Sequence, residues 1–305
     1  PRSSLFALSS GATKSFAACR ISCLPRQTPE RPLGSGDEQG RPIWGPMWTA
    51  FPTLFFRRLQ FMDKKSRLAR FVDSEQGTLS AENSYKGLRI YARSGLHACV
   101  AEQLVSVCPP GSMVLDLAAG SGAFSARCRD SGFQVTAVDA VEDNFKLRDT
   151  IPFRVCDLDE TFSGVDGAPF DAVVAIEIIE HLENPWHFFR QCFTLLRSGG
   201  KLIVTTPNTG SPVSKALFCR FSHSQWFSED DRHAHGHITS LRLWQFKQCA
   251  SDAGFHSIDI RSFGEPYEAV RGWWRLKMLA HLIDLVDPSS AKLKGEILIG
   301  TFSRP

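Results

Sequence analysis

Two carboxyl groups and an imidazole stand close together in the sequence, as Glu177, Glu180 and His181. The run Asp171–Ile179 is almost wholly apolar, which predicts a strand buried on both faces with these residues at its exit. A helical turn there would place the three side chains on one side of the chain. They could then hold a divalent cation that lowers the pKa of a hydroxyl group, and His181 or Glu180 could accept its proton.

Two of these residues also have plainer interpretations. Glu177 could simply contact the edge of a bound ligand, as a residue at the end of a strand can. His181 could be a hydrogen-bonded histidine that caps the turn before Asn184-Pro185. The residue types alone therefore leave the chemistry of this segment open.

A second candidate feature is the stretch Val114–Gly122, which reads VLDLAAGSG. It predicts a strand that ends near Asp116, a tight turn with Gly120 and Gly122, and the start of a helix. Glycine lets the backbone approach a ligand closely, and the first N–H groups of a helix have no partner inside it. This is the local geometry of a nucleotide-binding crevice, although a packed turn without a ligand has the same pattern.

Strands and helices alternate around this turn. Apolar patterns predict strands at 134–138, 153–156, 171–179, 201–206, 257–263 and 296–302. Helices are expected near 90–107, 141–148, 185–197, 241–253 and 267–286, with an irregular insertion at 207–238. The alternation predicts an α/β fold with a doubly wound, parallel sheet.

The net charge of +3 is unevenly distributed over the 305 residues. Residues 1–61 contain 8 Lys and Arg against 3 Asp and Glu, whereas residues 62–305 contain 27 and 29. The main body is slightly acidic, which gives no support for broad nucleic-acid binding. We expect residues 1–61 to be a disordered or non-native extension and residues 62–305 to form one domain.

The cysteine content and the hydropathy of the chain bear on the cellular compartment in which the protein resides. The nine cysteines are an odd number and are mostly scattered, which favours reduced thiols and a cytosolic protein. No run approaches the 18 or more apolar residues of a membrane span.

The chain resembles a class I S-adenosylmethionine (SAM) dependent methyltransferase over roughly residues 90–305. The motifs that carry this resemblance are Val114–Gly122, Asp139, Asp157-Leu158, FDAVVAIEIIEHLENP and RSGGKLIVTTPN. The resemblance implies the Rossmann-like methyltransferase fold, a mostly parallel seven-stranded sheet with an antiparallel last strand. A dinucleotide oxidoreductase competes for the first motif, but its G-x-G-x-x-G lacks the third glycine here, where Ser125 stands.

The resemblance also implies how the glycine turn binds SAM. The family pattern D-x-G-x-G-x-G is matched by Asp116, Ala118, Gly120 and Gly122, so an alanine replaces its first glycine. Asp116 is expected near the amino group of SAM, and the Gly120–Gly122 backbone against its amino-acid part. Ala118 would slightly limit how closely the backbone approaches the methionine part.

Later strand ends supply the other implied cofactor contacts. Asp139 is expected to accept hydrogen bonds from both ribose hydroxyls. Asp157 is expected to accept from the adenine amino group while the Leu158 N–H faces the ring, and a loop cap is the alternative for Asp157. Glu177 is expected at the edge of the cofactor.

The segment Glu177–His181 is similar to the E-x-x-E-H of ubiquinone-pathway O-methyltransferases and of small-RNA 3′-terminal 2′-O-methyltransferases. The RNA enzymes add a later histidine, and His237 matches it without their D-H-x-F-E-W surroundings. This similarity implies Mg²⁺ or another divalent cation at Glu177, Glu180, His181 and His237, with His181 and Glu180 as the catalytic residues.

Two insertions, at 207–238 and 266–290, bear on the methyl acceptor. His233 and His235 could join a metal cluster or be exposed loop histidines, since alternating spacing does not define a coordination geometry. Trp226 and Phe227 are expected to line the acceptor pocket. The Trp-bearing residues 271–286 could form a lid over a lipid-like acceptor, a helix on a membrane surface, or only a core helix.

We therefore predict a cytosolic enzyme that transfers a methyl group from SAM to a hydroxyl of a small-molecule, sugar or lipid-like acceptor. One alternative is an RNA 3′-terminal 2′-O-methyltransferase, whose binding would weaken with salt. Another is a non-catalytic scaffold with a SAM-type fold that binds only a partner.

Overall fold

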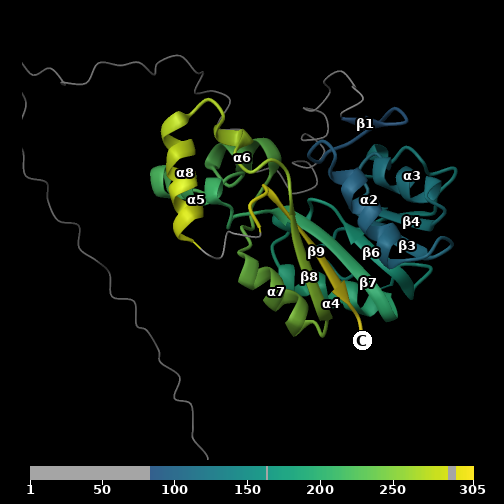
Figure 1. Cartoon of the computed structure of the whole chain (residues 1–305). Helices are drawn as coiled ribbons and strands as arrows, with labels where there is room; N and C mark the ends of the chain where they lie inside the picture. The colour runs from purple at the N-terminus through teal and green to yellow at the C-terminus, as the bar shows by residue number, and fades with distance from the viewer. Residues whose placement is uncertain (1–82, 163, 288–292) are drawn as a thin grey trace, which may run out of the picture. The chain divides into compact units, whose positions relative to one another are not determined.

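The computed structural model describes residues 83–162, 164–287 and 293–305, which Figure 1 draws as the coloured ribbon. The predicted extension, residues 1–61, lies outside the described residues. Its expected disorder and the domain boundary at residue 62 therefore stay predictions.

A seven-stranded sheet forms the centre of the described part, in the order β5-β4-β3-β6-β7-β9-β8. The strands are β3 (Met113–Leu117), β4 (Gln134–Asp139), β5 (Phe153–Val155), β6 (Phe170–Ala175), β7 (Leu196–Pro207), β8 (His256–Phe263) and β9 (Ile297–Ser303). β9 runs antiparallel to β7 and β8, and the pairs on the β5 side of β7 are parallel. The predicted mostly parallel sheet with an antiparallel last strand is confirmed.

Helices cover both faces of this sheet because its inner strands are apolar on both faces. The helices are α2 (Leu96–Val107), α3 (Ala123–Asp130), α4 (Pro185–Leu195) and α7 (Leu243–Asp252). On β6, Ala172 and Val174 pack in the cluster of α2 and α3, whereas Val173 and Ala175 pack in the cluster of α4 and α7. Figure 1 shows the two pairs of helices on opposite sides of the sheet.

The predicted start of α4 is confirmed in atomic detail. The side chain of Asn184 accepts a hydrogen bond from the backbone N–H of His187 at 2.9 Å, and Pro185 occupies the first turn. Both are stabilising features of a helix N-terminus, because they satisfy or remove N–H groups that the helix leaves unpaired.

The expected helix at 141–148 is wrong. Only a 3₁₀ turn, η2 (Glu142–Asn144), forms there. The reason is tertiary packing, since the buried ring of Phe145 stacks on Phe153 with centroids 4.5 Å apart and lies in the space left by Gly122. The backbone at Phe145 is extended there, with φ −75° and ψ 116°, so the helical turn ends where the ring is buried.

The region 207–238 is not irregular, because it contains α5 (Pro212–Phe221) and α6 (Glu229–His235). Ser211 caps α5 by accepting from Ser214 N–H at 3.0 Å. Ser228 and Asp231 form a capping box at the start of α6. These caps are the local signals that the sequence carried for both helices.

Other details of the secondary structure also differ from expectation. The helix predicted from residue 90 begins at Leu96, and β6 ends at Ala175 and is followed by the 3₁₀ turn η3 (Ile179–His181). The amphipathic helix predicted from 267 divides into the 3₁₀ turn η4 (Glu268–Val270) and α8 (Trp274–Val286). A short hairpin, β1 (Ser84–Tyr85) and β2 (Leu88–Arg89), precedes α2.

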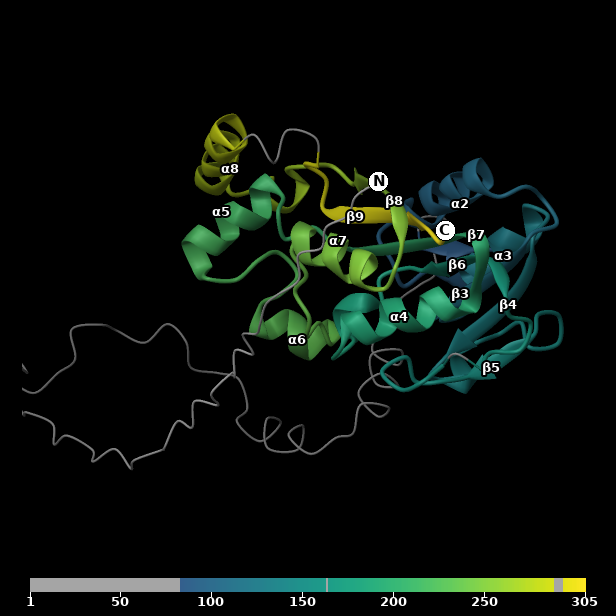
Figure 2. The ribbon, with the colours of Figure 1, turned by 90° about the horizontal axis from the view of Figure 1, so that it is seen from below.

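α5 and α8 lie side by side beyond the sheet edge in both views (Figure 2). They pack through a small cluster of their own that includes Val213, Ala216, Leu276 and Ala280. No helix within the described ranges is long and apolar enough to cross a lipid bilayer.

Candidate functional site

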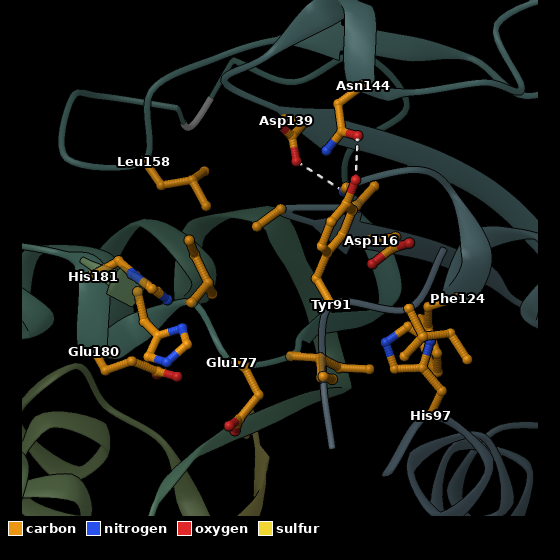
Figure 3. Close-up of a pocket in the computed structure, with 18 of the residues that line it drawn as sticks. Tyr91, His97, Asp116, Phe124, Asp139, Asn144, Leu158, Glu177, Glu180 and His181 are labelled. Atoms are coloured by element: carbon orange, nitrogen blue, oxygen red, sulfur yellow. Dashed lines mark hydrogen bonds between the residues drawn. The ribbon is translucent and has the colours of Figure 1, made fainter. Parts of the chain in front are cut away.

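A pocket of about 450 Å³ lies where the parallel strands β3, β4, β6 and β7 end. Ligands in open α/β sheets bind at this edge because the loops that follow the strands converge there. The volume falls in the range of small-molecule and cofactor sites. Figure 3 shows Asp116 and Tyr91 on one side of the pocket and Glu180 and His181 on the other.

Asp116 lies in β3, buried at the floor of the pocket. Its Oδ2 accepts a hydrogen bond from the Ser125 hydroxyl at 2.5 Å. Burial raises the pKa of Asp116 from 3.8 to about 7, against the opposing effect of the Ser125 hydrogen bond. A cationic amino group in the pocket would favour the ionised form of this carboxyl group.

The turn after β3 has positive φ angles at Ala118, Gly120 and Gly122, of 57°, 56° and 91°. A Cβ at Gly120 would lie 3.1 Å from the Tyr91 ring, and one at Gly122 would lie 2.9 Å from the Phe145 ring. Glycine is therefore required at both positions for packing of the chain on itself as well as for the backbone conformation. Ala118 and Gly120 line the pocket, whereas Gly122 lies behind them as the N-cap of α3.

Asp139 ends β4 and faces the pocket with its carboxyl group held by the backbone. Oδ2 accepts from Gly120 N–H and Oδ1 from Val141 N–H, both at 2.8 Å. Burial raises the pKa of Asp139, and these hydrogen bonds oppose that rise. Each oxygen retains lone-pair capacity for one further donor, as two ribose hydroxyls would need.

Asp157 and Leu158 follow β5 and line the same pocket. Asp157 Oδ1 accepts from Asp159 N–H at 3.0 Å, which is the loop-capping interaction that sequence reasoning kept as an alternative. Leu158 is buried beside it. The structure thus brings the three acids and Leu158 into one pocket.

Glu177 stands just after β6 with a positive φ of 49° and is bonded to β7. Its N–H donates to Thr205 Oγ1 at 2.9 Å, and the Thr205 hydroxyl donates to Glu177 Oε1 at 2.8 Å. Burial raises the pKa of Glu177 to about 7. Because φ is positive here and the helical turn starts only at Ile179, Glu177 does not continue the helical side chain pattern of Glu180 and His181.

Glu180 is fully buried, and neither of its carboxyl oxygens makes a hydrogen bond of ordinary geometry with a described residue. Burial, and secondarily the negative charge of Glu177, raise its pKa well above the ordinary value. The neighbouring Thr206 hydroxyl acts on it only to the extent of opposing the rise in its pKa. A buried carboxyl group without donors costs free energy unless a ligand or proton satisfies it. Glu180 is therefore a polar group of the pocket that requires a partner.

His237 is brought beside His181 by main-chain hydrogen bonds. The N–H groups of Ile238 and Thr239 both donate to the carbonyl of Glu180 at 2.9 Å, so this segment is fixed on η3. The rings of His181 and His237 are 4.9 Å apart and nearly perpendicular. Two segments far apart in the sequence thus meet in one place, and we call Glu180, His181 and His237 together the polar corner.

The tautomer of His237 follows from its partner. Its Nδ1 lies 2.7 Å from the carbonyl oxygen of Trp226, which can only accept a hydrogen bond, so Nδ1 carries the proton. Burial lowers the pKa of His237, which favours the neutral ring. Nε2 then keeps the lone pair that a metal ion or a proton could bind.

Glu180, His181 and His237 each offer a ligand atom within 4.8 Å of the others. Glu177, the fourth residue of the expected set, is not part of this cluster. His233 is exposed on α6, with Glu229 3.9 Å away, whereas His235 is half-buried and lines the pocket. The two are therefore helical residues and not loop residues, and three of the four expected metal ligands come together.

Several pocket residues were not found by sequence reasoning. The hydroxyl of Tyr91 donates to Asn144 Oδ1 at 3.1 Å across the glycine turn. His97 is buried at the start of α2 with its Nδ1 unpartnered among the described residues, and burial lowers its pKa to about 3. Glu296, just before β9, also lines the pocket. A polar residue beside Leu96 on an otherwise apolar helix face was the available signal for His97.

The two aromatic residues of the first insertion differ in their relation to the pocket, and their contact with a methyl acceptor stays a prediction. Trp226 lines the pocket, while Phe227 lies behind it with its ring 5.6 Å from that of His237.

The chain is similar to known methyltransferases in both family pattern and sequence. A family model described as a methyltransferase domain matches residues 89–260. The mitochondrial ubiquinone biosynthesis O-methyltransferase of Rattus norvegicus is 31% identical over 146 residues, which cover 44% of this chain and 42% of that protein. The ubiquinone biosynthesis O-methyltransferase of Caulobacter sp. is 38% identical over 106 residues, 32% of this chain and 42% of that protein. The matches thus span less than half the length of these relatives.

Solved structures share the fold at low sequence identity. A SAM-dependent methyltransferase from Archaeoglobus fulgidus aligns with a TM-score of 0.50 and 17% identity, over 68% of this chain and 94% of that one. A phosphoethanolamine N-methyltransferase from Haemonchus contortus, in complex with SAM, aligns with a TM-score of 0.50 and 15% identity, over 82% of this chain and 59% of that one. With the family match over more than half of its residues and the pocket at the strand ends, the chain belongs to the methyltransferase domain family, as a class I SAM-dependent methyltransferase.

Proposed function

We propose that this protein transfers the methyl group of SAM to a hydroxyl of a small-molecule, sugar or lipid-like acceptor. The observation that carries the proposal is Glu180, a buried carboxyl group whose oxygens make no hydrogen bond of ordinary geometry with the described residues. It lies beside His181 and His237, in the same pocket as the three acids at the strand ends. A hydroxyl nucleophile needs a group that removes its proton or weakens its O–H bond. Glu180, His181 and His237 are groups of this kind.

The residues on the other wall fit SAM by charge and hydrogen bonding. Asp116 suits the amino group, the Asp139 oxygens suit two ribose hydroxyls, and Asp157 with Leu158 suits the adenine. When bound, SAM supplies a sulfonium-activated methyl group. The chain's own task is then to hold the acceptor oxygen in line with that group and exclude water from the pocket.

The polar corner can act on the hydroxyl in two ways. In the first, His181, or Glu180 in its ionised form, accepts the hydroxyl proton directly. In the second, Glu180, His181 and His237 hold a divalent cation that lowers the hydroxyl pKa. The unpartnered carboxyl and the lone pair on His237 Nε2 fit a cation, and two imidazoles favour Mn²⁺ or Zn²⁺ over Mg²⁺.

Calorimetry with SAM tests the cofactor half of the proposal, and it also separates an enzyme from a non-catalytic scaffold. We expect measurable SAM binding that Asp139→Ala abolishes. Because Asp139 also holds Gly120 and Val141, circular dichroism of the variant must show that the fold persists. Absence of SAM binding by the folded wild-type chain would support the scaffold alternative.

An acceptor screen with methyl-labelled SAM tests the other half. We expect label in a hydroxyl-bearing catechol, sugar or prenylated phenol and not in amines of matched size. Chelation by EDTA should reduce turnover, and Mn²⁺, Zn²⁺ or Mg²⁺ should restore it if the cation route holds. Unchanged turnover in excess chelator would leave the direct-base route.

RNA 3′ ends form a separate arm of the same screen. The relatives at 31–38% identity are named for ubiquinone biosynthesis, which favours a small acceptor over RNA. Salt-sensitive binding and labelling of an RNA end would reverse that choice. The cytosolic location stays a prediction, for cell fractionation to check.

A further inference from the structure

α8 is apolar on two opposite faces. Its inner face packs on α5 through Leu276, Leu279, Ala280 and Ile283. Its outer face carries Trp274, Met278, Leu282 and Leu285, with exposed fractions of 64%, 56%, 57% and 83%. These four residues follow a spacing of four, four and three, so they form one stripe along the helix. A helix that only covers a core would have a polar outer face.

The stripe continues onto neighbouring residues. Trp273 and Val286 at the ends of α8 are exposed, as are Phe218 and Phe221 on α5. The rings of Phe221 and Trp273 are 5.7 Å apart in an edge-to-face arrangement, which joins the two helices at the surface. We name this set the α5–α8 surface. It comprises Phe218, Phe221, Trp273, Trp274, Met278, Leu282, Leu285 and Val286.

Cations border the α5–α8 surface. Arg220, Arg271, Arg275 and Lys277 are exposed, and none of them forms an ion pair with another described residue. The guanidinium of Arg275 lies 5.2 Å from the centroid of the Trp274 ring, and that of Arg220 lies 5.0 Å from the centroid of Phe221. The surface therefore combines aromatic rings with positive charges at its border.

The acids of the same helices are already neutralised. Asp284 pairs with Lys294 at 2.7 Å, and Asp287 pairs with Lys215. The charges left for an external partner are therefore positive. An occupant of this surface must be apolar at its centre and anionic at its border.

That requirement distinguishes between candidate occupants. A second copy of the chain would bring the same cations against the first, and residues 1–61, with 8 Lys and Arg against 3 Asp and Glu, are themselves basic. Like charges disfavour both. A bilayer with anionic headgroups has an apolar interior beneath a negative surface, and tryptophan and arginine are typical at that boundary.

We propose that the α5–α8 surface docks on an anionic lipid membrane, with its aromatic and aliphatic side chains at the headgroup boundary and Arg220, Arg271, Arg275 and Lys277 on lipid phosphates. Docking of this kind is peripheral and goes beyond methyl transfer. It gives the helix pair a role that its own small core does not explain.

The surface is also connected to the pocket. Arg93 lines the pocket and pairs with Glu268 of η4, the turn that leads into α8. Its Nε lies 3.6 Å from Glu296, another pocket residue. Resting on the proposed function, a docked protein would hold this wall of the pocket near the bilayer, where a lipid-like acceptor resides.

Vesicle flotation with the full chain tests the proposal. Phosphatidylcholine vesicles with and without phosphatidylglycerol are the probes. We expect binding to the anionic vesicles only, with loss at high salt. The double variants Trp273→Ala/Trp274→Ala and Arg271→Glu/Arg275→Glu should each lower the partition coefficient about tenfold or more.

Matched control variants lie on α7, on another part of the fold. Trp244 is 62% exposed there and Lys247 is exposed beside it, so Trp244→Ala and Lys247→Glu should leave vesicle binding unchanged. Light scattering should find the same oligomeric state for wild type and for Trp273→Ala/Trp274→Ala. Calorimetry with SAM shows that each variant is folded, and the vesicle result can be read whether or not an acceptor is found.

Three results would overturn the proposal. One is no binding of the wild-type chain to anionic vesicles. Another is binding that the α5–α8 variants leave intact, which would place membrane contact elsewhere in the chain. The third is a dimer that Trp273→Ala/Trp274→Ala dissociates, which would assign the surface to a second copy.

Discussion

The carboxyl groups on the two walls of the pocket differ in how far the protein satisfies them with hydrogen bonds. Asp139, on the cofactor wall, accepts two backbone N–H groups at 2.8 Å from its own chain. Glu180, on the acceptor wall, is fully buried and makes no hydrogen bond of ordinary geometry with the described residues. A carboxyl group that the fold already satisfies is positioned in advance, whereas one left unsatisfied is available to react or to bind a cation.

The two walls also differ in how far apart in the sequence their residues lie. The cofactor wall is built mainly from residues at or near the ends of successive strands, so each strand contributes its own acid. The acceptor wall needs η3, the end of β7 and the segment after α6 to meet. Contacts of that kind depend on backbone hydrogen bonds such as those from Ile238 and Thr239 to Glu180.

The largest predicted effect concerns Asp116 and the dependence of stability on pH. Its pKa rises from 3.8 to about 7 on folding, so the folded state holds a proton that the unfolded state has lost between these values. The free energy of unfolding should therefore fall as pH rises from about 4 to 7, by about 4 kcal/mol at full effect. Denaturant titrations without SAM, across this pH range, measure it.

Asp116→Asn is the control for that prediction, because it removes the titrating group and keeps a similar shape. The free energy of unfolding of this variant should not show the fall that Asp116 causes between these pH values. An identical slope in wild type and variant would mean that Asp116 is ionised in the folded protein. Its carboxyl group would then be stabilised by hydrogen bonds as fully as that of Asp139.

Next in size is the effect of Glu180→Gln on turnover. The amide can neither take up a proton nor bind a cation strongly, so kcat/KM should fall about 100-fold or more. The SAM affinity should change little, because Glu180 lies on the other wall. A parallel loss of SAM affinity, seen by calorimetry, would break the division into two walls.

A smaller effect is expected from His237→Ala on cation binding. Losing one of three ligands should weaken Mn²⁺ or Zn²⁺ binding about tenfold or more. Metal titration monitored by calorimetry checks this, with His233→Ala as the matched control because that side chain is exposed on α6 outside the cluster. Equal cation affinity in both variants would exclude His237 as a ligand.

The smallest effect is a gain in stability from Ala118→Gly. Ala118 holds a φ of 57°, a region that glycine adopts with less strain, so the variant should be more stable by up to about 1 kcal/mol. Unfolding in urea measures the gain. A loss instead would mean that the greater freedom of glycine in the unfolded chain outweighs the relief of strain.

The central strands and the α4 start could be predicted from the sequence because their signals are local. An apolar run such as Phe170–Ala175 has few alternatives to a buried strand, and Asn184-Pro185 is a strong helix start. The helix expected at 141–148 failed for the opposite reason. Packing of the Phe145 ring against Gly122 is a long-range contact that periodicity does not reveal.

The sequence by itself determined the methyltransferase motifs, the strands of the central sheet, and the acids at the strand ends, because each depends on a few neighbouring residues. Only the tertiary structure separated Glu177 from Glu180. A positive φ and two hydrogen bonds to Thr205 hold Glu177 against β7, while His237 joins Glu180 and His181 through the backbone of a distant segment. Residue types specify which groups could react. Long-range hydrogen bonding and burial then decide which of these groups stay unpaired and available for reaction.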